Sequence, residues 1–92
     1  SGTRIKILDA WAAGLPVLST SVGASGLNYE AGRHIMIEDD LAAFSERIRE
    51  LFHTPGLLPR LGQGALEAVE PYRWDVIGRH YGEVLQTLVS EN

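Results

Sequence analysis

The chain has 92 residues, enough for one domain or part of one, and a chain of this size buries only a thin core. Its hydrophobic share of 45% and charged share of 22% are ordinary for a globular protein and argue against intrinsic disorder. The net charge is −4 and the basic residues are scattered, which argues against a nucleic-acid binder, while the absence of cysteine excludes disulfides, zinc–thiolate sites and thiol catalysis.

A short apolar helix is predicted close to the start of the chain. Residues 5–13 are apolar except for Lys6 and Asp9, and a helix of this composition is expected to be buried on most of its surface. Gly14 is suited to the left-handed residue that ends such a helix. Two charged side chains inside an apolar helix need a reason, which makes them candidates for function.

Two short strands are predicted next. Residues 16–20 form an apolar run that begins with proline, as expected for a buried parallel strand with proline at its first position. Residues 21–33 are rich in turn residues and predict a loop, and residues 34–37 predict a second strand. Loops at the carboxyl ends of strands are where open α/β sheets bind ligands.

The rest of the chain predicts helices. Apolar side chains recur at helical spacing in residues 41–52, 58–69 and 74–88, and in the second of these segments Gly62 and Gly64 weaken the pattern. The fold class is therefore α/β, with two short parallel strands and about four helices, as in a partial Rossmann-like domain.

Two short strands rarely form a stable sheet unaided. We therefore expect the strand over residues 16–20 to lack a neighbour, because the chain is part of a longer protein. Alternatively, a second copy of the chain supplies that neighbour and a homodimer forms.

Several segments, taken in order, resemble the retaining glycosyltransferases of family 4, which have the GT-B fold. One is G-T-R-I-K-I-L-D-A, followed by A-A-G-L-P-V, which is similar to the family's G-T-R-[LI]-K-[IL]-L-E-A-[MW]-A-x-G-x-P-V-V-x-T segment. The others lie at residues 22–27 (V-G-A-S-G-L), 38–44 (E-D-D-L-A-A-F) and 72–74 (Y-R-W).

The resemblance implies that residues 1–92 are the C-terminal fragment of a nucleotide-sugar-binding, Rossmann-like domain, the second half of a GT-B C-terminal domain. The parent would transfer a sugar from a nucleotide-diphosphate-sugar donor, with no other cofactor and no metal ligand in this part. Its partners would be the nucleotide sugar and the rest of the parent enzyme. No apolar run approaches the roughly 20 residues of a membrane span. We expect a cytoplasmic location, or one peripheral to the inner membrane for the parent.

The resemblance also implies a substrate site but no catalytic residue. Gly2, Thr3 and Arg4 match the turn whose backbone meets the diphosphate, and a helix N-terminus favours an anion there. Asp9 matches the second acid of the family's E-x7-E pair, which contacts the ribose, and Lys6 could reach a phosphate.

Two departures from the family pattern concern the acidic pair. Ser1 stands where the family's first acid contacts the donor sugar, and Asp9 replaces the usual glutamate with a shorter side chain. The chain therefore matches the nucleotide end of such a site better than the sugar end.

Structural alternatives exist for each of these residues. Asp9 and Lys6 could simply pair with each other, Arg4 could be a solvated first-turn residue, and the turn glycines at 23 and 26 could serve the loop alone. The three histidines are isolated from other ligand types, and the acids at 38–40 are expected to cap a helix. Trp74 and Tyr81 are expected in the core. The whole chain could also be a non-catalytic α/β module that binds a protein partner.

Overall fold

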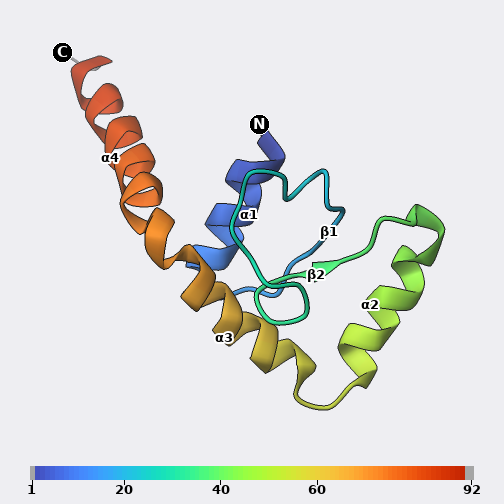
Figure 1. The fold of residues 1–92 in the computed structure, drawn as a ribbon. Helices are drawn as coiled ribbons and strands as arrows, with labels where there is room; N and C mark the ends of the chain where they lie inside the picture. Colours follow the sequence, from blue (N-terminus) through green and yellow to red (C-terminus); the bar gives the residue numbers. More distant parts are fainter. Residues whose placement is uncertain (1, 91–92) are drawn as a thin grey trace.

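The fold is a mixed α/β arrangement in which two short parallel strands lie between helices (Figure 1). It was obtained as a computed structural model that describes residues 2–90, with side chains described as far as residue 82. The regular elements are, in order, α1 (Gly2–Ala12), β1 (Leu18–Ser19), β2 (Met36–Ile37), η1 (Leu41–Ala43), α2 (Phe44–His53), α3 (Leu57–Val69), η2 (Glu70–Tyr72) and α4 (Arg73–Ser90). The predicted fold class, with two short parallel strands and four α-helices in the described residues, is confirmed.

Helix α1 ends as its sequence predicts. Gly14 adopts a φ of 70°, its N–H donates to the carbonyl of Trp11, and the N–H of Leu15 donates to the carbonyl of Ala10. This pair of bonds is the Schellman arrangement, in which a left-handed glycine satisfies the last carbonyls of a helix. The expected burial of α1 on most of its surface is wrong, because Ile5 is 41% exposed and burial is confined to Ile7, Leu8 and Trp11.

The sheet is shorter than predicted. Leu18 pairs with Met36 and Ser19 with Ile37, and the ladder is extended by bonds from the N–H groups of Met36 and Glu38 to the carbonyls of Val17 and Ser19. Strand character requires a paired neighbour. Within the described residues β1 has only β2 as a neighbour, so only the middle of the predicted segment 16–20 is a strand.

The core has two clusters, one on each face of this small sheet. Since side chains alternate along a strand, Val17 and Ile37 face one side and Leu18 and Met36 the other. The first side joins α1 and the second half of α3, and the second side joins α2 and the start of α3. Helix α3 contributes to both clusters and therefore holds the two faces together.

The two glycines of α3 are packing residues. A Cβ built on Gly62 would lie 2.7 Å from the carbonyl oxygen of Gly14, and one built on Gly64 would overlap the carbonyl oxygen of Arg33. Both positions let backbone approach the helix more closely than any side chain would permit. The glycines that weaken the helical pattern in the sequence are thus the residues that allow α3 to pack.

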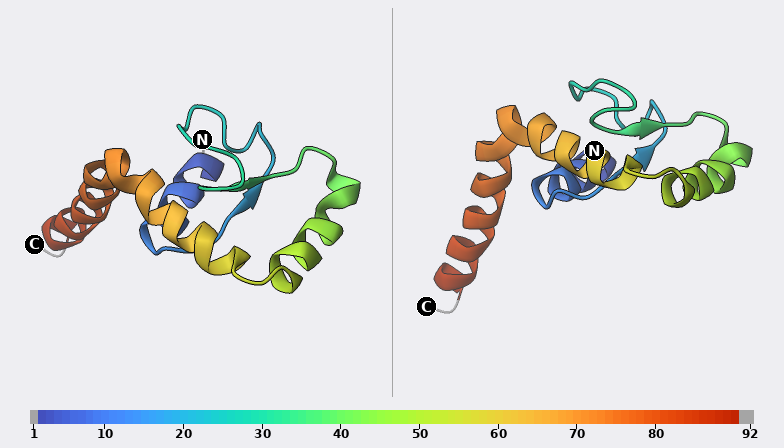
Figure 2. Two further views of the ribbon diagram at one scale, coloured as in Figure 1. Left: turned by 60° about the horizontal axis from the view of Figure 1, so that its bottom comes forward. Right: turned by 90° about the horizontal axis from the view of Figure 1, so that it is seen from below.

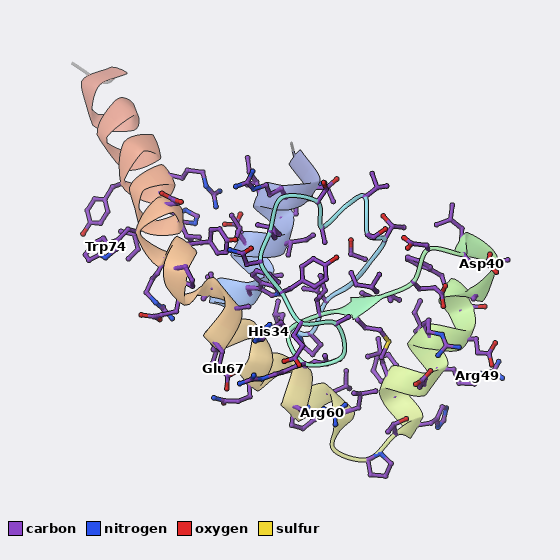
Figure 3. The ribbon with its side chains drawn as sticks, viewed as in Figure 1. His34, Asp40, Arg49, Arg60, Glu67 and Trp74 are labelled. Atoms are coloured by element: carbon purple, nitrogen blue, oxygen red, sulfur yellow. The ribbon has the colours of Figure 1, made fainter. Side chains whose placement is uncertain are left out.

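Helix α4 extends away from the rest of the molecule and contacts α1 through its first half (Figure 2). Trp74 and Tyr81, which were expected in the core, are 79% and 66% exposed, and Figure 3 shows Trp74 on the side of α4 turned away from α1. That expectation is wrong because Val76, not the aromatic residues, faces the core. The apolar positions predicted at 84, 85 and 88 lie outside the residues with described side chains. Across the part of the chain that the structure describes, no helix combines the length and apolarity needed to cross a membrane.

Candidate functional site

The N-terminus of α1 meets the loop that follows β1. A Cβ built on Gly23 would lie 2.7 Å from Ser19 Oγ and 3.2 Å from Thr3 Cγ2. Gly26, with a φ of 87°, comes close to the guanidinium of Arg4, which a Cβ would approach to 3.5 Å. The fold therefore brings the start of α1 to the carboxyl end of β1, the edge at which open α/β sheets bind ligands.

The five residues predicted to bind substrate lie on α1 and are open to solvent to different degrees. Gly2, Thr3, Arg4 and Lys6 are exposed, and Asp9 is half-buried. Positions 2, 6 and 9 follow helical spacing and share one face of α1. The first N–H groups of a helix have no intrahelical partner and carry its positive dipole end. Backbone donors, two cations and a carboxylate therefore occur together along one helix.

Asp9 does not pair with Lys6, the alternative that its sequence neighbourhood suggested. Instead Arg79 of α4 donates from Nη2 to Asp9 Oδ1 at 3.0 Å, and His80 Nε2 lies 3.9 Å from the same oxygen. Lys6 forms no ion pair with any described residue and is exposed to solvent. The Asp9–Arg79 contact joins residues 70 positions apart, so no local pattern in the sequence could have indicated it.

A second polar contact ties the ends of the two strands together. The backbone N–H and the hydroxyl of Ser21, just after β1, both donate to the carboxylate of Asp39, just after β2, over 2.7 to 2.9 Å. The backbone bond, and then the hydroxyl bond, hold the pKa of Asp39 below its usual value. Asp39 thus fixes the start of the loop that reaches Thr3.

The neighbouring acids have separate structural partners. Asp40 caps η1 by accepting from the N–H of Ala42 at 3.0 Å, which confirms the predicted cap. Glu38 Oε1 lies 3.2 Å from Nε of Arg47 on α2. Within the described residues no group of histidine and acidic side chains is arranged to hold a metal ion.

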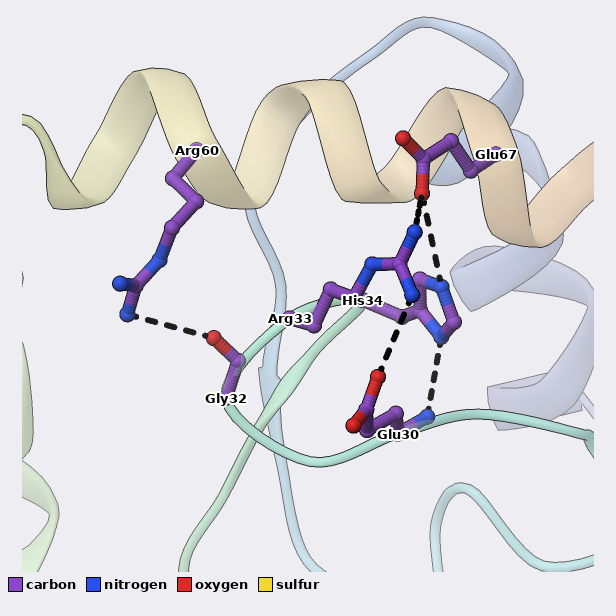
Figure 4. Close-up of polar contacts among 6 residues, drawn as sticks. All are labelled: Glu30, Gly32, Arg33, His34, Arg60 and Glu67. Carbon is purple, nitrogen blue, oxygen red and sulfur yellow. Dashed lines mark hydrogen bonds and ion pairs between the residues drawn. The ribbon is translucent and has the colours of Figure 1, made fainter.

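A third polar group fastens the loop before β2 to α3 (Figure 4). Arg33 bridges Glu30 and Glu67, and His34 accepts at Nδ1 from the N–H of Glu30, while Arg60 donates to the carbonyl of Gly32. The bond with Glu30 and the charge of Glu67 raise the pKa of Arg33. These side chains bond to one another or to the nearby backbone. We therefore call Glu30, Arg33 and Glu67 the latch and assign it a structural role, which is to hold the loop before β2 on α3.

The sequence was compared with known proteins. Residues 1–54 match the model of a family described as "Glycosyl transferases group 1". Three relatives are each named "D-inositol 3-phosphate glycosyltransferase": from Streptomyces coelicolor (31% identical over 74% of this chain), Streptomyces scabiei (33% over 92%) and Streptomyces avermitilis (34% over 74%). The matched segments cover 15%, 20% and 15% of those relatives, so the chain spans a fifth of their length or less. No solved structure matches the chain.

Proposed function

Because this chain belongs to the glycosyl transferases of group 1, we propose that it forms part of the donor site of a retaining GT-B glycosyltransferase. The donor is a nucleotide-diphosphate sugar, and the reaction is a hexosyl transfer. The proposal is supported by the family match and by the position of α1 at the carboxyl edge of the strands.

The first turn of α1 carries the proposal, as the binding site of the diphosphate. Its free N–H groups and dipole favour an anion, and Arg4 adds a cation at the same end. Gly2 has a φ that any residue can adopt, and a Cβ built there would meet no atom of another described residue within 4 Å. Neither the backbone nor the packing requires glycine at this position, and its lack of a side chain leaves the backbone N–H groups open to close approach of a ligand.

The rest of α1 supplies further contacts to the donor nucleotide. Lys6 is exposed and unpaired among the described residues, so its ammonium is available to a phosphate. Asp9 accepts from the ribose hydroxyls, because side chains on a helix lean toward its N-terminus and Asp9 shares a face with Lys6. Ser1, aligned with the family's sugar-binding acid, lies outside the described residues.

The chemistry assigned to α1 is stabilisation of the leaving diphosphate by the dipole of the helix and by its cationic side chains. It needs no cofactor other than the donor, and no general base is assigned here. We expect the 92-residue chain alone to be inactive, because it spans only a fifth or less of its relatives and the acceptor must be bound by the rest of the parent. For the parent we propose a cytoplasmic location, with peripheral binding to the inner membrane as the alternative.

A nucleotide titration followed by amide chemical shifts tests the proposal. UDP and GDP are added separately to the labelled chain, and shifts are expected at residues 2–6 and at Asp9. The Asp9→Asn variant should weaken binding by about tenfold, because a carboxylate that bonds hydroxyls is lost. The Asp75→Asn variant, which makes the same change at an exposed acid on α4, is the matched control and should bind as the wild type does.

The alternatives predict different results. A non-catalytic module that binds a protein would show no shifts at millimolar nucleotide, and that result would overturn the proposal. Self-association through the sheet edge would appear in light scattering as a particle of twice the 10.1 kDa chain mass. A monomer at all concentrations would exclude the homodimer and leave the rest of the parent as the neighbour of β1.

A further inference from the structure

Helix α4 presents two different faces. Val76, Arg79 and His80 lie on the side that meets α1, and Trp74 and Tyr81 lie on the opposite, exposed side. Within the described residues, the inner face carries one ion pair to α1, from Arg79 to Asp9, and His80 lies near the same carboxylate. The position of α4 is therefore coupled directly to the carboxylate assigned to the ribose.

The geometry of this contact leaves Asp9 able to bind a second partner. Arg79 and His80 both approach Oδ1, and Oδ2 accepts no hydrogen bond from a described residue. A carboxylate offers about four lone-pair sites, so one charge-assisted bond does not saturate it. The Asp9 side chain is also 42% exposed, which leaves it open to a ligand.

We propose that Arg79 is the positioning residue for Asp9 in the nucleotide site. A carboxylate that is partly open to solvent and has no fixed partner samples several rotamers, and ordering it on binding costs free energy. The bond from Arg79 at 3.0 Å orders it beforehand and leaves Oδ2 free for the ribose hydroxyls. This inference rests on the function proposed above, since Arg79 would affect the affinity for nucleotide only by positioning Asp9.

The test is a double-mutant cycle in the full-length protein. Binding of UDP or GDP, whichever the wild type binds, is measured for Asp9→Asn, Arg79→Gln and the double variant, with pyrophosphate as a probe that lacks ribose. Arg79→Gln should weaken nucleotide binding about fivefold, as expected for lost preorganisation, and leave pyrophosphate binding unchanged. In the Asp9→Asn background the same change should have little further effect, because residues acting as a unit are not additive.

Two further variants distinguish a positioning role of Arg79 from a general effect on the stability of α4. Arg79→Lys keeps a cation that can make a single bond and should recover part of the affinity lost in Arg79→Gln. Arg73→Gln removes another arginine of α4, whose partner is Glu70, three residues earlier, and should bind nucleotide as the wild type does.

The failures of the two proposals are distinguishable. If Asp9→Asn binds nucleotide normally, or the wild type binds neither nucleotide, the proposed function is wrong and the role of Arg79 falls with it. If Asp9→Asn weakens binding but Arg79→Gln does not, only the positioning role is wrong. Full additivity in the double variant, or equal weakening of pyrophosphate, would likewise overturn it.

Discussion

Asp39 illustrates how a single side chain can hold the edge of the candidate site. Its carboxylate accepts from the backbone N–H and the hydroxyl of Ser21, so it joins the ends of β1 and β2. The same bonds favour its ionised form and lower its pKa. The loop that begins at Ser21 leads to Gly23, which lies against Thr3.

The lowered pKa of Asp39 predicts a pH dependence. A carboxyl whose folded pKa lies below its unfolded value stabilises the fold above that unfolded value and loses the contribution as pH falls through the folded pKa. The carboxyl carbon of Asp39 should therefore titrate below 3.8 in an NMR experiment. Ser21→Ala should move the midpoint upward, and a midpoint at or above 3.8 in the wild type would contradict the contact.

The packing of helix α3 depends on two glycines, positions at which the helix carries no side chain. Gly62 faces the turn after α1, and Gly64 faces the backbone at Arg33, beside the latch of Glu30, Arg33 and Glu67. A helical pattern interrupted by glycine is a weaker helix by propensity. Here the close approach of backbone to α3 offsets that weakness.

Gly64→Ala should therefore destabilise the protein although alanine is the better helix former. Its Cβ would overlap the carbonyl of Arg33, and overpacking of this kind costs about 3 kcal/mol or more. Gly78→Ala on α4 is the matched control, because the added atom would meet no other described part of the chain within 4 Å, and it should stabilise by up to about 1 kcal/mol. Urea unfolding measures both, and an equal effect of the two changes would show that α3 is not so closely packed.

The whole molecule is long and unevenly packed, with extents of 51 × 24 × 21 Å. Its core lies around the two strands, where Leu61 of α3 is fully buried. Large apolar side chains elsewhere remain at the surface: Phe52 of α2 is 72% exposed, although its helical spacing predicts burial. Regular spacing identifies the face that a helix could bury, but burial also requires a neighbour.

Truncation of Leu61 and of Phe52 should have different effects on stability, because the first side chain is in the core and the second is on the surface. Leu61→Ala should lower the free energy of unfolding by about 3 kcal/mol, because it leaves a cavity between α3 and the sheet. Phe52→Ala should change it by less than about 1 kcal/mol in the isolated chain, since little of the ring is buried. Thermal unfolding of both variants measures this, and a large loss in Phe52→Ala would place that ring in the core.

The features predictable from the sequence are those that depend on neighbouring residues. The end of α1 at Gly14 follows from left-handed glycine geometry, and the cap at Asp40 follows from the chemistry of a short acid before a helix. The two strands and the four helices follow from composition and spacing. The residues assigned to the nucleotide came from the resemblance, and they remain predictions for experiment.

Tertiary structure alone decided which distant groups meet. The partner of Asp9 is Arg79 and not Lys6, because packing of α4 on α1 brings together residues that no local period relates. The same holds for Ser21 with Asp39 and for Gly64 with Arg33. A spacing of three or four residues identifies one face of a helix, but it carries no information on what packs against that face. For that reason Trp74 was expected in the core, whereas it lies on the surface.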